Sequence, residues 1–332
     1  MERKTPPFTF EELPEEETAN MKVRRIQDNN KLVRVVPSGF LLPYSFVKFA
    51  KHFYNFEFRH DDILVATFPK SGTVWMAEIL WALSHFDEIH TMDTTHINLR
   101  SYFIDLDFLH PPRSSDKVSL LQTFKEMCPD GKLEDGVMLQ MAKTEKKRRI
   151  IKTHLQFQSL NPSFLDTCKI VYVARNPKDV CVSLYYFMKN RPDMTVDGNF
   201  EDFVESFMDA KMTFSPYWAH LKQAWKLKDH PNFQWIFYED LKTDTMRELQ
   251  NLQKFLELDL SYDQLKVVAD ATSFENMKRR DEKQPLTKME GSFFRKGTVG
   301  DWKSVASPEL NARMDKWIQM NNNDGSIIFK YD

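Results

Sequence analysis

The chain has 332 residues, a formal net charge of −2, and 42% hydrophobic and 13% aromatic residues. This composition excludes a largely disordered chain and provides enough apolar side chains for one large α/β domain. The near-zero net charge creates no global field that would favour nucleic acid or an anionic membrane, so an anion site has to be built locally. Three cysteines without CxxC spacing argue against a disulfide framework or a zinc site and favour a reducing compartment.

Residues 1–17 are acidic and contain prolines, and residues 1–35 are polar and charged, without the apolar segment of a signal peptide. No apolar run in the chain approaches the roughly 20 residues that are needed to span a bilayer. We therefore expect residues 1–35 to form an N-terminal arm over one domain of residues 36–332. We also expect a cytoplasmic protein without membrane insertion.

Strand and helix patterns alternate along the chain. The aromatic segment 40–58 predicts a short core-facing helix, with a share in a ligand pocket as the alternative. Buried strands are predicted at 63–68, 149–152, 169–174 and 233–238, and helices at 74–86, 178–189, 242–257 and 308–321. Continuous apolar strands that alternate with helices indicate a parallel sheet covered on both faces. Ligands bind such sheets beyond the carboxyl ends of the strands.

The long segment 87–148 contains no predicted sheet strand. A connection of this length is typical of a pocket wall or a lid. The basic run KTEKKRR at 143–149 predicts a solvated surface.

A candidate anion site follows the first predicted strand. Lys70, Ser71, Gly72 and Thr73 form a short loop that opens a helix. Such a loop presents backbone N–H groups to an anion, and the helix dipole favours negative charge. The GxxxxGK[ST] spacing of a Walker A motif is absent. An ordinary strand-to-helix turn with Ser71 as a cap is the alternative.

A second candidate lies at the end of the third predicted strand. Arg175 stands where a guanidinium can bind a phosphate with two hydrogen bonds, and Ser183 follows within the next helix. The alternative is a structural ion pair between Arg175 and Asp179.

A third candidate combines Arg295 and Lys296 with Gly297 and Gly300, in a chain that has only nine glycines. Such a loop lets backbone amides and cations approach an anion closely. An exposed basic turn is the alternative.

His154 ends the second predicted strand, two residues after Lys152. A histidine in this position can act as a general base near neutral pH. A structural histidine, hydrogen bonded within the core, is the alternative.

Four motifs occur in order: FPKSGTVW at 68–75, IIKTH at 150–154, YVARNPKDVCVS at 172–183 and RKGTVGDWK at 295–303. From about residue 35 to residue 325 the chain resembles the cytosolic sulfotransferases, which use 3′-phosphoadenosine 5′-phosphosulfate (PAPS). The acidic N-terminus, the extended 87–148 region and the late MDKWIQ segment resemble the invertebrate branch, which includes an insect retinol dehydratase.

The resemblance implies a single α/β domain with a central parallel sheet flanked by helices. Its first strand, loop and helix would bind the phosphosulfate in a P-loop-like manner. The residues that the resemblance assigns to PAPS, and to its product PAP, are Lys70, Ser71, Gly72, Thr73, Val74, Trp75, Arg175, Ser183, Tyr238, Thr272, Ser273, Phe274, Met277, Phe294, Arg295, Lys296 and Gly297.

The resemblance assigns catalysis to His154 as the general base, with Lys70 and Lys152 stabilising the transition state. Sulfuryl transfer, like phosphoryl transfer, depends mainly on alignment and charge stabilisation, which agrees with these residue types. The scheme requires no metal.

The acceptor is expected to be a small, largely apolar phenol, alcohol, steroid, catecholamine, retinoid or amine. We expect an apolar acceptor because the chain is rich in aromatic side chains and ligand pockets are lined mostly by apolar groups. The expected acceptor-site residues are Phe46, Phe108, Phe157, Tyr185 and Phe293. A homodimer is compatible with the sequence. However, the family's dimer pattern KxxxTVxxxE is not matched, since Ser307, Pro308 and Ala312 stand at its last three fixed positions after Lys303.

Three other functions remain as alternatives. A dehydratase would act through a transient sulfate ester, and its product would lose water instead of gaining SO3. A nucleotide kinase would need a Walker lysine followed by a Mg²⁺ ligand, and the loop at 69–73 lacks that spacing. A non-catalytic protein that binds a nucleotide or a hydrophobic ligand is the third; Lys152 and His154 together argue against it.

Overall fold

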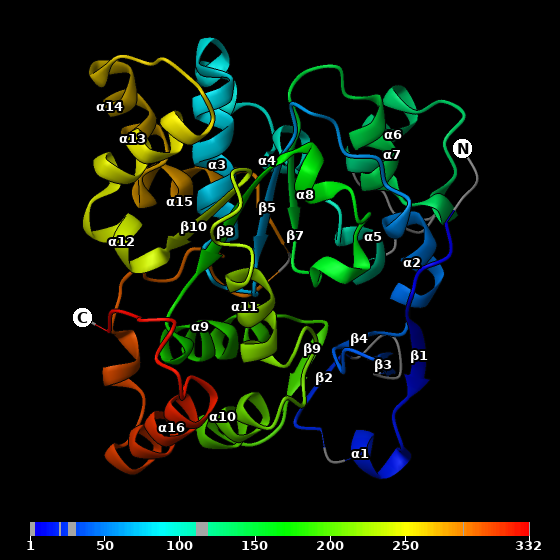
Figure 1. Cartoon of the computed structure of the whole chain (residues 1–332), viewed down its shortest axis with the longest axis vertical. Helices are drawn as coiled ribbons and strands as arrows, with labels where there is room; N and C mark the ends of the chain where they lie inside the picture. The colour runs from blue at the N-terminus through cyan, green and yellow to red at the C-terminus, as the bar shows by residue number, and fades with distance from the viewer. Residues whose placement is uncertain (1–3, 20, 26–30, 111–118, 288, 332) are drawn as a thin grey trace.

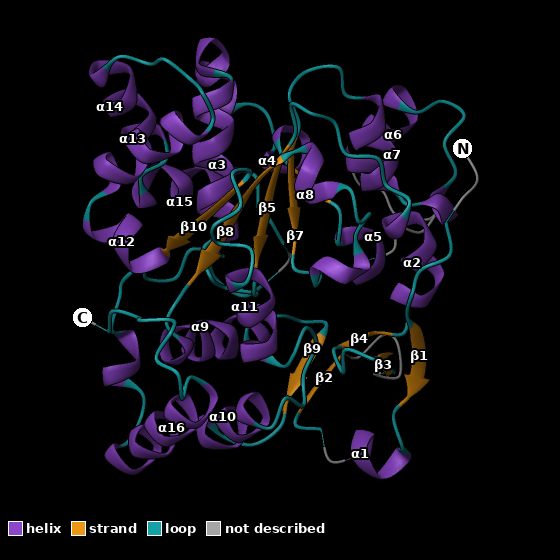
Figure 2. Cartoon of the chain, viewed as in Figure 1, coloured by secondary structure: helices purple, strands orange, loops and turns teal. Residues whose placement is uncertain are grey.

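The computed structural model describes residues 4–19, 21–25, 31–110, 119–287 and 289–331. Its centre is a five-stranded parallel sheet in the order β10-β8-β5-β7-β6 (Figure 2). The strands are β5 (Ile63–Thr67), β6 (Tyr102–Phe103), β7 (Ile150–Thr153), β8 (Lys169–Ala174) and β10 (Phe233–Phe237). The expected α/β fold with a central parallel sheet is therefore confirmed.

Helices cover both faces of this sheet (Figure 1). Alternate residues of β5 and β8 belong to two different hydrophobic clusters, as the two-residue period of a strand requires. One cluster includes Val65 and residues of α3 (Thr73–Ser84), α13 (Thr245–Phe255) and α14 (Tyr262–Ala271). The other includes Leu64 and residues of α7 (Val137–Thr144), α9 (Pro177–Lys189) and α11 (Tyr217–Trp225). Burial on both faces explains why the strands are continuously apolar.

The remaining helices surround this core. They are α1 (Glu15–Ala19), α2 (Phe46–Tyr54), α4 (Ile97–Arg100), α5 (Leu106–Leu109), α6 (Ser119–Met127), α8 (Phe164–Thr167), α10 (Phe200–Met208), α12 (Tyr238–Thr243), α15 (Phe274–Lys283) and α16 (Pro308–Asn321). Short 3₁₀ segments lie at Phe86–Asp93, Leu133–Asp135, Phe157–Ser159 and Asp301–Ser304. Within the described ranges, no helix combines the length and the apolar character that crossing a membrane requires.

The N-terminal region forms small antiparallel sheets. β1 (Thr9–Glu12) pairs with β3 (Leu32–Val36), which also pairs with β4 (Leu41–Pro43). β2 (Val23–Arg25) pairs with β9 (Met194–Val196), which follows α9. The expected boundary between residues 35 and 36 falls inside β3, so the first residues are tied to the rest of the chain by strand pairing.

Two expectations about secondary structure are wrong. The segment 87–148 does contain a sheet strand: β6 pairs with β7 at the sheet edge, but its two residues are too few to show a period. The predicted helix 242–257 is interrupted at Asp244, whose side chain accepts a hydrogen bond from the Arg247 N–H at 3.0 Å and begins α13.

Arg149 corrects the expectation of a solvated basic run. Lys143, Lys146 and Lys147 are exposed, whereas Arg149 is only 1% exposed. Its Nε and Nη2 donate to the two carboxylate oxygens of Asp62 at 2.6 and 2.5 Å, and its Nη1 donates to a backbone carbonyl at 3.0 Å. The bidentate pair joins the residues that precede β5 and β7. The local sequence hides this role, because Asp62 lies 87 positions away.

We predict that Arg149→Ala destabilises the protein strongly, because it leaves the Asp62 carboxylate buried without its partner. Losing one partner of a buried pair costs roughly 3–5 kcal/mol in the free energy of unfolding, measured by urea denaturation. Lys147→Ala is the matched control from the same run, because its 2.6 Å pair with Glu88 is exposed and contributes little. Similar losses in both variants would contradict this account.

Candidate functional site

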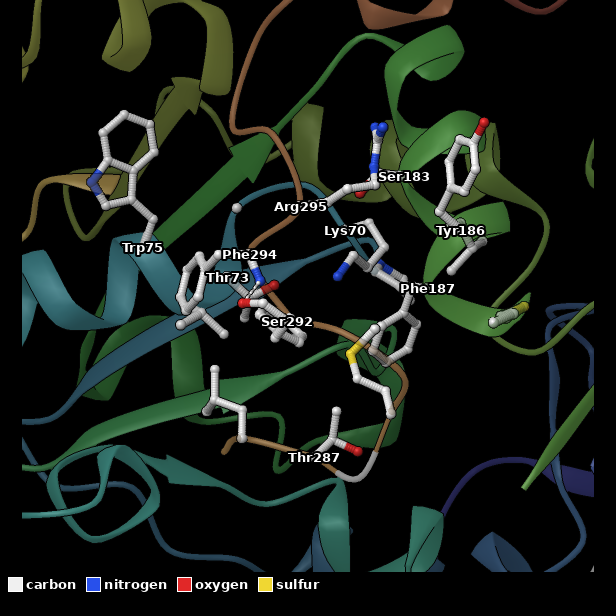
Figure 3. A pocket seen from close by; sticks show the side chains of 18 of the residues that line it. Lys70, Thr73, Trp75, Ser183, Tyr186, Phe187, Thr287, Ser292, Phe294 and Arg295 are labelled. Atoms are coloured by element: carbon white, nitrogen blue, oxygen red, sulfur yellow. Dashed lines mark hydrogen bonds between the residues drawn. The ribbon is translucent and has the colours of Figure 1, made fainter. Parts of the chain in front are cut away.

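A cavity of about 320 Å³ opens beyond the carboxyl ends of the parallel strands. Its walls come from the loops that follow β5, β7 and β8, from α9, and from residues 286, 287, 289 and 292–298 (Figure 3). The residues assigned to the cofactor or to catalysis that line it are Lys70, Gly72, Thr73, Val74, Trp75, Lys152, His154, Arg175, Ser183, Tyr238, Phe274, Met277, Phe294, Arg295, Lys296 and Gly297. The sheet therefore brings three distant motifs and a strand-end histidine into one cavity.

The loop between β5 and α3 has the backbone of an anion cradle. Lys70 and Gly72 both have positive φ angles, 67° and 106°, and α3 begins at Thr73. A Cβ on Gly72 would lie 2.8 Å from the ring of Tyr238, so a side chain there is excluded. Ser71 does not line the cavity, but its buried hydroxyl has no partner among the described residues.

Arg175 connects three segments at the end of β8. Its Nη1 donates to the Lys70 carbonyl at 3.2 Å, and its Nη2 donates to the Thr298 carbonyl at 3.0 Å. The alternative pair with Asp179 is present but long, at 4.0 Å. Asp179 mainly accepts hydrogen bonds from the backbone N–H groups of Gly300 at 2.8 Å and Trp302 at 3.2 Å. Asp179 therefore holds the loop of residues 295–303, which we call the RKG loop, against α9. The Nε of Arg175 is buried and has no partner in the described part of the chain.

The RKG loop presents two cations that share one carboxylate. Asp301 accepts a hydrogen bond from Lys296 Nζ at 2.5 Å and another from Arg295. The Arg295 guanidinium also lies 4.6 Å from the ring centroid of Tyr186. Gly297 has a φ of 65°, and a Cβ there would lie 2.3 Å from the Phe274 ring. One carboxylate against two cations leaves net positive charge at this loop.

His154 is held as a neutral imidazole. Its Nδ1 lies 2.9 Å from the Thr67 carbonyl oxygen, which can only accept a hydrogen bond. The Nδ1 therefore carries the proton, and Nε2 keeps a free lone pair. Burial is the main cause that lowers the pKa of His154 to about 3, with smaller contributions from the nearby His220, Lys70 and Lys152. The ring is thus neutral at pH 7, with its Nε2 lone pair available.

Asp105 fixes the backbone beneath this histidine, and the sequence analysis missed it. Its carboxylate accepts hydrogen bonds from the His154 N–H and from the Thr153 hydroxyl, both at 2.6 Å. Burial raises the pKa of Asp105 to about 7. Asp107 caps α7 in the same way, through the N–H groups of Met138 and Leu139. The available signal was a pair of acids two residues apart within an apolar stretch.

Of the two lysines of the site, Lys152 is buried and Lys70 is half-buried. Burial, with a smaller contribution from neighbouring arginines, lowers the pKa of both Lys70 and Lys152 to about 7. Lys152 Nζ lies 3.4 Å from Asn98 Oδ1 and 5.8 Å from the Phe103 ring centroid. An anion in the cavity would favour the charged form of both lysines.

Two residues assigned to the adenine side do not line the cavity. Thr272 is fully buried, and its hydroxyl donates to the Val268 carbonyl at 2.8 Å. Ser273 accepts a hydrogen bond from the Asn276 N–H at 3.3 Å and caps α15. Thr272 and Ser273 thus fix the position at which α15 begins. The side chains of Phe274 and Met277 on this helix do line the cavity. On the other wall the rings of Trp75 and Tyr238 meet edge to face at 5.6 Å.

The expected acceptor residues need a larger correction, because only Phe293 lines the cavity. Phe46 and Phe108 pack on each other with centroids 5.0 Å apart, and Phe157 stacks on Phe164. These rings, with Tyr185, belong to the hydrophobic core. Aromatic abundance alone does not separate a core from a cavity wall.

The sequence analysis also missed three aromatic side chains that do form the wall, Tyr186, Phe187 and Phe214. Helical spacing could have identified one of them. Phe187 lies one turn after Ser183 on α9 and shares its face, whereas Tyr185 points elsewhere.

We predict that His154 stays neutral, with its proton on Nδ1, between pH 5 and pH 9 in the nucleotide-free protein. The reason is its burial and its hydrogen bond to the Thr67 carbonyl. ¹⁵N NMR of labelled histidine, with the resonance assigned by a His154→Asn variant, measures both properties. A midpoint between pH 6 and pH 7, or a proton on Nε2, would contradict the assignment.

Comparisons with known proteins agree with this geometry. A family model described as a sulfotransferase domain matches residues 60–326. Human Sulfotransferase 1C2 is 32% identical over 283 residues, which cover 83% of this chain and 88% of that protein. Human Sulfotransferase 1E1 is 31% identical over 300 residues, covering 88% of this chain and 94% of that protein.

A crystal structure of retinol dehydratase with androsterone and the inactive cofactor PAP is also similar. Its TM-score is 0.83 at 26% identity, with 97% of this chain and 98% of that chain covered. A retinol dehydratase structure with retinol and PAP has a TM-score of 0.82 at 25% identity, covering 98% of this chain and 99% of that one. The motif order, the cavity and these matches lead to one assignment: the chain belongs to the sulfotransferase family.

Proposed function

We propose that this sulfotransferase moves the sulfuryl group of PAPS to a hydroxyl or amine of a small, largely apolar acceptor, with His154 as the general base. One observation carries the proposal. A neutral His154 with its Nε2 lone pair available lines the same cavity as the half-buried Lys70 and the buried Lys152. PAP occurs in the related retinol dehydratase structures, which supports the same nucleotide here.

The residues of the cavity fit the two phosphate groups of this donor. Lys70, Gly72 and Thr73 would hold the 5′-phosphosulfate, whereas Ser71, which the resemblance also assigns to it, is buried outside the cavity lining. The residues proposed for the 3′-phosphate are Arg175, Ser183, Arg295, Lys296 and Gly297. Those proposed for the adenine are Val74, Trp75, Tyr238, Phe274, Met277 and Phe294.

Sulfuryl transfer requires that the protein align donor and acceptor, accept one proton and stabilise the developing negative charge. His154 Nε2 would take the proton of the acceptor hydroxyl while the oxygen attacks sulfur. Lys70 and Lys152 would stabilise the negative charge on the transferring group and on the leaving phosphate. The apolar walls would exclude water, which otherwise competes as an acceptor.

The acceptor half of the cavity indicates an apolar substrate. Its wall combines Phe103, Phe187, Phe214 and Phe293 with aliphatic and methionine side chains. Phenols, alcohols, steroids, catecholamines and retinoids remain the proposed classes. We prefer plain transfer over a dehydratase reaction because the relatives at 31–32% identity are sulfotransferases. Three buried free cysteines support a cytoplasmic location as part of the proposal.

We predict that His154→Ala lowers turnover by roughly 10²–10⁴, the usual contribution of a positioned general base. The affinity for PAP should stay close to that of the wild type, because His154 would act on the acceptor. Initial rates with several phenols and alcohols, together with calorimetry of PAP binding, test both parts. Turnover near the wild-type rate with good acceptors would refute the role of His154.

We predict that Arg295→Ala weakens the binding of PAP by about tenfold to a hundredfold, since a charge-assisted hydrogen bond contributes roughly 1.5–3 kcal/mol. AMP, which lacks the 3′-phosphate, is the matched control ligand, and its affinity should change little. Isothermal titration calorimetry with both nucleotides provides the comparison. An equal loss for PAP and AMP would place Arg295 outside the 3′-phosphate site.

A further inference from the structure

The ammonium group of Lys70 lies between two aromatic rings. Its Nζ is 4.2 Å from the ring centroid of Phe187 and 3.9 Å from that of Phe293. Within the described chain, no carboxylate or carbonyl accepts a hydrogen bond from this Nζ, so the rings are its closest recorded partners. Figure 3 shows Lys70 beside Phe187 at the centre of the cavity.

The two rings come from different parts of the chain. Phe187 belongs to α9, whereas Phe293 belongs to the segment between α15 and the RKG loop. The rings meet edge to face, with centroids 5.8 Å apart. The Phe293 backbone N–H donates to Asp281 Oδ2 at 3.0 Å, which ties the backbone of this residue to α15. The surroundings of Lys70 therefore depend on the position of the segment that carries Phe293.

The other groups that face Lys70 disfavour its charge. Burial is the largest effect, and positive charges act from three directions while a single carboxylate opposes them. The facing groups are Arg175 after β8, Arg191 after α9, Arg295 on the RKG loop, Asp281 on α15 and His154 after β7.

Aromatic rings differ from carboxylates in what they leave for an incoming anion. A ring face attracts a cation through its quadrupole, by about 0.5–1 kcal/mol when exposed and about 2 kcal/mol or more when desolvated. It does not neutralise the formal charge of the lysine. A protonated lysine held by two rings thus keeps its formal charge available for a sulfuryl or phosphate oxygen.

We propose that Phe187 and Phe293 are positioning residues that keep Lys70 protonated and directed into the cavity before the anion arrives. The inference rests on the proposed function for the role of Lys70 in transfer. The contact of Lys70 with the two rings, which we call the clamp, is a property of the nucleotide-free protein and can be measured without turnover.

The direct test is competitive labelling of the nucleotide-free protein with acetic anhydride at a series of pH values, read by peptide mass spectrometry. Phe187→Leu and Phe293→Leu should each lower the pKa of Lys70 by about half a pH unit to one and a half, since one pH unit corresponds to 1.36 kcal/mol. Phe187→Tyr and Phe293→Tyr, which keep a ring face, should restore the wild-type value.

Tyr185→Leu is the matched control. Tyr185 lies on the same helix, and Lys189 Nζ lies 5.3 Å from its ring centroid, outside the cavity. Its loss should leave the pKa of Lys70 unchanged. An unchanged or raised pKa in both Phe→Leu variants, or Tyr variants that behave like the Leu variants, would overturn the clamp.

The pH profile of kcat/KM for PAPS connects the clamp to transfer, because it reports ionisations of the free enzyme. The Leu variants should lose more activity at pH 8 than at pH 6. Equal losses at both pH values would indicate only a packing role and would overturn the proposal. A shifted Lys70 pKa in a protein that makes no sulfated product would leave the clamp standing and refute the proposed function.

Discussion

Positive charge that is buried but only partly compensated dominates the cavity. Burial holds the pKa of Lys70 and of Lys152 at about 7, far below the ordinary value for lysine. The nearby carboxylates are engaged elsewhere: Asp179 accepts backbone N–H groups of the RKG loop, and Glu78 pairs with Arg100 and Arg280. A ligand with two separate anionic groups would supply the missing charge. The order of the strands, the position of the loops and the apolar walls all serve this arrangement.

The parallel sheet makes such a site possible because all of its strands end at one edge. β5 lies at the centre, with β7 and β8 as its neighbours, so the loops after these strands are adjacent. The RKG loop then closes the arrangement from more than 100 residues further along the chain. The Arg175 hydrogen bond to Thr298 spans 123 positions, and the Asp179 bond to Gly300 spans 121. The 3′-phosphate end of the proposed site is therefore a product of tertiary structure.

The sequence predicted the strands of the sheet correctly where each strand has a recognisable local pattern. Buried parallel strands need continuous apolar runs, and the structure has strands at all four predicted places. The prediction failed where a strand is too short to show a pattern or where the partner of a residue is distant in the sequence. β6 has only two residues, and Asp62, the buried partner of Arg149, lies 87 positions away. The cavity collects most of the motif residues because they stand at strand ends. Their individual roles stay predictions.

Aromatic residues were the weakest part of the sequence analysis. Phe46, Phe108 and Phe157 carry the same local hydrophobic signal as Phe187, yet they fill the core. Burial in a core and exposure to a cavity both favour apolar side chains, so composition cannot separate them. Spacing relative to a polar site residue is more informative, as the face shared by Ser183 and Phe187 illustrates. The wall that results is apolar around a polar reaction centre.

Product analysis tests the central claim most directly. The protein would be incubated with radiolabelled PAPS and a panel of phenols, steroids and allylic alcohols, including retinol, followed by mass spectrometry of every product. The account predicts a labelled product whose mass equals the acceptor plus SO3, formed together with an equal amount of PAP. A product that has lost water and carries no label, or no PAP formed with any acceptor, would contradict it.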